Sequence, residues 1–82
     1  MATLQDGDTV YFWTLHGNDL TFCTGKIIIV GGRPYTEPHE LGTTQADPQT
    51  QRIPLDPRNL EAQPDGVDGE RRWLHRGHVV IP

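Results

Sequence analysis

The side chains best suited to chemistry in this chain are four histidines and a single cysteine. A structural zinc site uses about four Cys or His ligands at recognisable spacings. The nearest approach here is His75 and His78, which are three positions apart, and residues three apart on a strand point to opposite faces of a sheet. The pattern therefore favours no metal site. The alternative is a zinc site that recruits Cys23 or His16 as further ligands.

Catalysis also receives little support from the residue pattern. A nucleophilic Cys23 would need a nearby histidine and an exposed thiolate, yet it lies between Phe22 and Thr24 in a strand-like segment, where a thiol is usually a packing residue. The acidic run 65–70 lacks the alternating oxygen ligands and final glutamate of a calcium loop. Gly31 and Gly32 are not followed by the lysine and helix start of a phosphate-binding loop. We predict no enzymatic activity and no cofactor.

The aromatic residues give a stronger indication of function. If Val10 and Phe12 face the core, strand alternation places the side chains between and beyond them on the opposite face. Tyrosine and tryptophan on an exposed face are typical of protein interfaces, because their rings bury a large area and keep a polar edge. The alternative is that a small fold buries both faces of this strand. The predicted partner-binding residues are Tyr11, Trp13, Tyr35 and Trp73.

A cluster of arginines near the end of the chain defines a second hypothesis. Arg71, Arg72 and Arg76 fall within six positions and are predicted to contact phosphates or an acidic partner, with Trp73 stacking on a base. The chain has seven Lys and Arg against eleven Asp and Glu, a formal net charge of -4. Because phosphate binding needs an excess of basic side chains, this charge disfavours non-specific nucleic-acid binding. A nucleic-acid-associated domain is therefore the alternative function.

Length and composition limit the organisation of the chain. Its 82 residues are enough for one small domain, residues 1–82, with a modest core. The longest apolar run, residues 27–30, is far too short to cross a membrane, and the first residues lack the features of a secretory signal. A lone cysteine cannot form an internal disulfide. These features predict a cytoplasmic protein, and the marginal core favours a homo-oligomer.

The elements that must position these side chains are predicted to be short strands. Residues 9–15 and 20–30 should form a hairpin across a turn at 16–19, with the second strand bent at Gly25. Residues 35–37 and 53–55 can form further short strands, and 72–81 should pair with an early strand. Asp56 followed by proline predicts a capped helical turn. Residues 42–51 carry no large apolar side chain and are predicted to form a mobile loop.

Together these elements predict an all-β fold, a small antiparallel barrel with a long polar loop and at most one short helical turn, since barrel closure removes exposed edges. The segments 7–10, 17 and 25–27 resemble the opening hairpin of SH3-like barrels, particularly the Tudor and KOW groups, over about the first 35 residues. That resemblance implies a five-stranded barrel used for recognition. We therefore expect a non-catalytic protein-binding module, for example an accessory or inhibitor protein of a phage or a bacterium.

Overall fold

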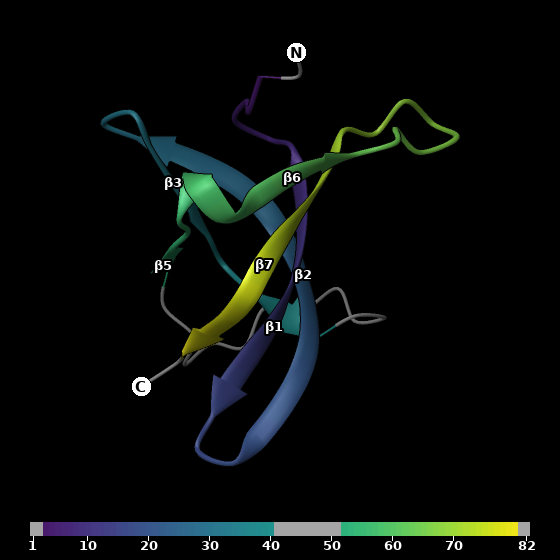
Figure 1. Cartoon of the computed structure of the whole chain (residues 1–82). Helices are drawn as coiled ribbons and strands as arrows, with labels where there is room; N and C mark the ends of the chain where they lie inside the picture. Colours follow the sequence, from purple (N-terminus) through teal and green to yellow (C-terminus); the bar gives the residue numbers. More distant parts are fainter. Residues whose placement is uncertain (1–2, 41–51, 81–82) are drawn as a thin grey trace.

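The computed structural model describes residues 3–40 and 52–80, and the regular structure there is mostly β-strand (Figure 1). The predicted all-β fold is confirmed. The elements are β1 (Thr9–His16), β2 (Asp19–Val30), β3 (Arg33–Thr36), β4 (His39–Glu40), β5 (Ile53–Pro54), the 3-10 helix η1 (Pro57–Asn59), β6 (Leu60–Gln63) and β7 (Arg72–Val80). In this part of the chain we find no helix with the length and apolarity to span a membrane.

Strands β1 and β2 form the predicted hairpin. Their antiparallel register runs from Thr9 opposite Lys26 to His16 opposite Asp19. Gly17 in the turn has a φ of +63°, a left-handed conformation that glycine adopts without steric cost. The hairpin therefore follows from two β-rich segments joined by a turn that glycine permits.

Strand β2 is long because it pairs with two other strands, β1 and β3. Residues up to Lys26 pair with β1, and residues from Ile27 to Val30 pair with β3. The change of partner falls next to Gly25, where a Cβ atom would lie 2.3 Å from the hydroxyl oxygen of Thr36 and 2.9 Å from the carbonyl oxygen of Glu37. The prediction of one long strand interrupted at this glycine is confirmed, and the reason is close approach of the next strand.

The other neighbour of β1 is β7, and this pairing is parallel. The expectation of a wholly antiparallel arrangement is therefore wrong for this pair, although the predicted pairing of the final segment with an early strand is confirmed. Tyr11 lies opposite Leu74 and Trp13 lies opposite His78, so β7 has two more residues than β1 over this interval. One of them, Gly77, has a φ of +79°. An even number of extra residues leaves the alternation of inward and outward side chains unchanged.

The strand order β5-β3-β2-β1-β7-β6, with β4 paired to β2, has β5 and β6 at its two ends. Only η1 and its flanking residues join them, so a connection of five residues, 55–59, at most about 20 Å long, links the edges. The sheet must therefore curve round the core. Asp56 caps η1 by accepting a hydrogen bond from the backbone N–H of Arg58 at 3.0 Å, which confirms the predicted capped turn.

The core lies on the concave side of this curved sheet. Val10 and Phe12 are fully buried, which confirms the predicted inward face of β1. Trp73 is only 7% exposed and belongs to the same core, so the prediction that its ring lies at the surface is wrong. The buried apolar residues are Val10, Phe12, Cys23, Ile27, Ile53, Leu55, Trp73 and Val79. The predicted mobile loop at 42–51 lies outside the described residues.

Candidate functional site

The convex side of strands β2, β1 and β7 carries a set of apolar side chains, here called the outer patch, with Thr24 and His78 lying among them. Because Val10 and Phe12 point inward, their alternate neighbours on β1 point outward. The strand registers then place one outward residue of β2 and one of β7 opposite each of them, and all of these are apolar except Thr24 and His78. The outer patch consists of Tyr11, Trp13, Leu15, Leu20, Phe22, Leu74 and Val80.

Three aromatic rings form the centre of the outer patch. The Phe22 ring lies directly across from Trp13, with centroids 5.0 Å apart and planes tilted by 52°. On its other side, Phe22 is stacked with Tyr11 at a centroid distance of 6.2 Å and an interplanar angle of 11°. Both geometries are favourable for aromatic pairs. The rings therefore hold one another in place before any partner arrives.

The outer patch is open to solvent at the end nearest the hairpin turn. Trp13 is 45% exposed and Leu20 is 47% exposed, and Val80 on the neighbouring strand is more exposed still. None of the seven residues of the outer patch carries a charge. Scattered exposed apolar residues are normal on proteins, but a contiguous set on one face indicates an interaction site.

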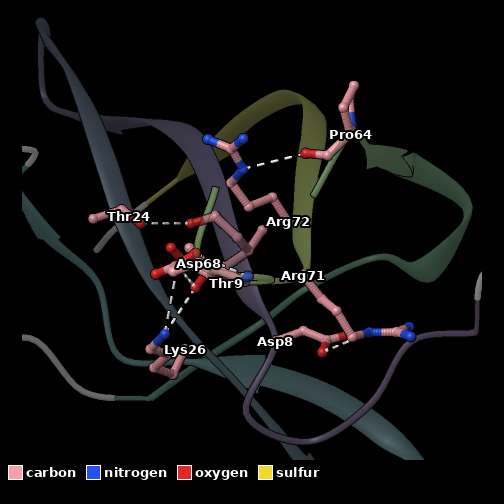
Figure 2. A network of polar contacts seen from close by, with 10 residues as sticks. Asp8, Thr9, Thr24, Lys26, Pro64, Asp68, Arg71 and Arg72 are labelled. Atoms are coloured by element: carbon pink, nitrogen blue, oxygen red, sulfur yellow. Dashed lines mark hydrogen bonds and ion pairs between the residues drawn. The ribbon is translucent and has the colours of Figure 1, made fainter. Parts of the chain in front are cut away.

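At its other end the outer patch forms the floor of a groove of about 360 Å³. Tyr11, Phe22 and Leu74 supply the apolar floor, and the rim is polar. On the rim, the Nε of Arg72 donates a hydrogen bond to the backbone carbonyl of Pro64 at 3.3 Å (Figure 2). The groove thus combines an aromatic surface with a guanidinium group.

A polar cluster ends the apolar surface beyond this groove (Figure 2). The Nζ of Lys26 donates to the hydroxyl of Thr9 at 2.8 Å and lies 3.5 Å from a carboxylate oxygen of Glu70. The hydroxyl of Thr9 also donates to Glu70. These groups pair with one another, so the cluster carries no unpaired charge. It marks the polar end of the outer patch.

A buried carboxylate connects the start of the chain to β7. Asp8 is only 5% exposed, and one of its oxygens accepts hydrogen bonds from the Trp73 indole N–H at 2.9 Å and the Gln5 backbone N–H at 3.0 Å. Its other oxygen lies 3.0 Å from the Nε of Arg71, a pair visible in Figure 2. The polar edge of Trp73 is therefore used internally. Its predicted role at a partner surface has no geometric support.

The predicted site residues are only partly brought together. Tyr11 and Trp13 share the outer patch. Tyr35 lies on β3 opposite Ile28, six positions along β2 from Phe22 and beyond the change of strand partner, so it lies apart from them. Conversely, Phe22 and Leu74 belong to the outer patch but were not among the partner-binding residues predicted from the sequence. The hairpin register could have identified Phe22, because a turn at 16–19 places it opposite Trp13.

The three predicted basic residues do not form one patch. Arg71 pairs with Asp8, and Arg76 lies 3.3 Å from a carboxylate oxygen of Glu61. Only Arg72 lines the groove. These pairings place a carboxylate beside two of the three guanidinium groups, so the described residues do not form the predicted three-arginine patch for phosphates.

The buried histidine and cysteine side chains make contacts within the fold. His75 is buried, and its Nε2 accepts a hydrogen bond from the backbone N–H of Asp56 at 3.3 Å. Cys23 is buried with its sulfur 3.5 Å from the hydroxyl of Thr14. His78 lies on the outer side of β7, away from His75. Among residues 3–40 and 52–80, no three His, Cys, Asp or Glu side chains are grouped as metal ligands.

Two ionisable groups outside the outer patch, Asp56 and Arg58, have shifted pKa values. The side chain of Arg58 donates two hydrogen bonds to Asp56, at 3.1 and 3.0 Å, and together with the backbone N–H of Arg58 it lowers the pKa of the Asp56 carboxyl. The same contact raises the pKa of Arg58. This pair stabilises the η1 cap and has no connection to the outer patch.

Comparison of the chain with protein-family models, with curated proteins and with solved structures finds no match. The resemblance of the opening hairpin to SH3-like barrels therefore stays a prediction. Functional inference for this chain depends on its own surface.

Proposed function

We propose that this protein is a non-catalytic binding module whose outer patch docks against another protein. The observation that carries the proposal is an apolar surface on β1 and β2, extended by Leu74 and Val80 on β7, that remains open to solvent. Trp13 and Leu20, each nearly half exposed, stand at its most accessible end. Keeping such side chains in water is unfavourable by about 25 cal/mol for each Å² of apolar surface, and a protein partner removes that cost.

The chemistry of the surface defines the kind of partner. With no charge among its seven residues, the outer patch would recognise a complementary apolar surface rather than a charged ligand or a nucleic acid. Aromatic residues near the centre of an interface usually contribute most of its affinity. Trp13 and its neighbour Phe22 are pre-positioned by their ring contact, so little side-chain freedom is lost on binding.

The test uses two variants with equal starting exposure. Leu20 in the outer patch and Val30 at the far end of β2 are both 47% exposed. We expect Leu20→Ser to lose a specific partner captured from a lysate of the native host, and Val30→Ser to retain it. The captured protein is then purified and titrated calorimetrically, where Trp13→Ala should weaken binding by about 2 kcal/mol or more.

Two results would contradict the proposal. If the protein captured by the unmodified chain is also captured undiminished by both Leu20→Ser and Trp13→Ala, its binding surface lies elsewhere. A steep fall of affinity with salt, close to the slope expected for several phosphate contacts, would instead favour the nucleic-acid alternative.

A further inference from the structure

The loop between β6 and β7 presents one apolar side chain at its tip. Gly66 and Gly69 close a β-turn there, because the Gly69 N–H donates to the Gly66 carbonyl at 2.9 Å. The Gly66 N–H in turn donates to the Glu70 carbonyl at 2.9 Å. Val67 occupies the tip of this turn and is fully exposed. Figure 1 shows the loop projecting away from the rest of the sheet.

Two carboxylates flank this valine. Asp65 precedes it by two positions and Asp68 follows it directly, and both side chains are exposed. Asp68 also accepts a hydrogen bond from the Glu70 backbone N–H at 2.9 Å, which helps to fix the turn. The tip is thus a pre-organised element that offers an apolar side chain between two negative charges.

The groove on the outer patch has the complementary character. Its floor is apolar, and Arg72 stands on its rim. Among the described residues, five of the seven Lys and Arg side chains lie within 4.0 Å of a carboxylate, and Arg72 is not one of them. Its neighbours Arg71 and Arg76 both are. The groove therefore pairs apolar side chains with a guanidinium that has no carboxylate within 4.0 Å among the described residues.

We propose that two copies of this chain form a symmetric dimer in which Val67 of each copy enters the groove of the other. Tyr11, Phe22 and Leu74 would surround the valine, and the flanking carboxylates would reach the guanidinium of Arg72. Val67 is fully exposed, so it does not fill the groove of its own chain. A second copy would supply an apolar group for the groove and carboxylates within reach of the guanidinium of Arg72.

The positions of tip and groove favour a closed dimer over an open chain of molecules. Pro64 lines the groove and Val67 follows three residues later, so the tip and its own groove are separated by about 10 Å at most. A two-fold axis between them brings both tips to both grooves at once. The contact is small, so we expect a weak dimer with a dissociation constant on the order of 10 to 100 μM. The Trp13 end of the outer patch stays available for the partner proposed above.

Sedimentation of the whole chain over about 5 to 500 μM is the first test. We expect a monomer–dimer equilibrium that Val67→Ser weakens at least about tenfold and that Val30→Ser leaves unchanged. Because Val67 is fully exposed, its replacement should leave the thermal transition unchanged. A chain that stays monomeric throughout, or a dimer that Val67→Ser does not weaken, would overturn the proposal.

A charge exchange tests the pairing directly. One variant carries Arg72→Glu with the acidic loop retained. The other carries Asp65→Lys and Asp68→Asn with Arg72 retained, since the asparagine oxygen still accepts from the Glu70 N–H. Each variant alone opposes like charges across the proposed contact and should be monomeric, whereas an equimolar mixture should restore the dimer. If the mixture remains monomeric, or if either variant dimerises alone as well as the unmodified chain, the proposed pairing is wrong. Neither outcome depends on the protein partner of the outer patch.

Discussion

Replacing Asp8 by alanine tests whether a single buried carboxylate holds the beginning and the end of this domain together. The change removes the acceptor for the Trp73 indole N–H, which lies in the core and has no other partner among the described contacts. It also removes the charge that faces Arg71 at 3.0 Å. A backbone bond from Gln5 is lost as well.

The expected magnitude follows from these contacts. An indole N–H left buried without an acceptor costs about 1 to 3 kcal/mol, and a hydrogen bond to a charged group contributes about 1.5 to 3 kcal/mol. Because Arg71 is partly exposed and water can solvate it, we take the lower part of that range for its contribution. Asp8→Ala should therefore lower the free energy of unfolding by about 3 to 4 kcal/mol. Domains of this size have roughly 4 to 12 kcal/mol in total.

Urea denaturation followed by tryptophan fluorescence measures this loss. Asp6→Ala is the matched control, because among the described residues Asp6 accepts a single exposed hydrogen bond, from the Ile29 N–H at 2.8 Å, and its loss should cost about 1 kcal/mol. Asp8→Asn should fall between the two, since its amide oxygen can keep the bond to Trp73 while the charge is lost. If Asp8→Ala unfolds at the same urea concentration as Asp6→Ala, the carboxylate has no structural role and the reasoning fails.

Three further predictions concern the core, the strand bend and the cap. Trp73→Ala should cost about 3 to 5 kcal/mol and largely unfold the domain, whereas Trp13→Ala should keep a cooperative thermal transition, as calorimetry can show. Gly25→Ala should cost at least about 2 kcal/mol in urea denaturation, because its Cβ would lie 2.3 Å from a threonine hydroxyl of β3. The pKa of Asp56 is lowered in the folded state, so its contribution to stability is fully present above the unfolded pKa of about 3.9 and is lost as the pH falls through the lower folded value. Arg58→Gln should raise that pKa toward its ordinary value in an NMR titration of the carboxyl carbon; an unchanged titration would contradict this assignment.

Local patterns predicted the features that local physics controls. Alternation along β1 placed Val10 and Phe12 on one face and Trp13 on the other, because neighbouring side chains in a strand point to opposite faces, and burial shows that the Val10 face is the inner one. The glycine at position 25 marked the point where β2 changes partner. The pair Asp56 and Pro57 marked the capped turn, since a cap depends on two neighbouring residues.

Features that depend on distant parts of the chain were not predictable in the same way. Trp73 is surrounded in sequence by arginines and histidines, which indicated an exposed ring. Burial of Trp73 becomes favourable only because Asp8, 65 residues away, accepts its N–H. The parallel register of β1 and β7 likewise has no local signal, because neither strand's composition specifies the direction of its neighbour. The groove combines residues of β1, β2, β6 and β7, so it exists only after the sheet has formed.

The parallel pairing of β1 with β7 also has a consequence for how the domain folds. The β1–β2 hairpin can form early, because its residues are close in the chain. The other edge of β1 pairs with β7, which lies more than 60 residues away in the chain. Bringing these two strands together costs loop-closure entropy before their contacts can form. Folding should therefore be slow for so small a domain, on the scale of milliseconds to seconds. During that delay β1 presents an unpaired edge beside exposed Trp13 and Phe22, so the partly folded chain is the species most prone to aggregate.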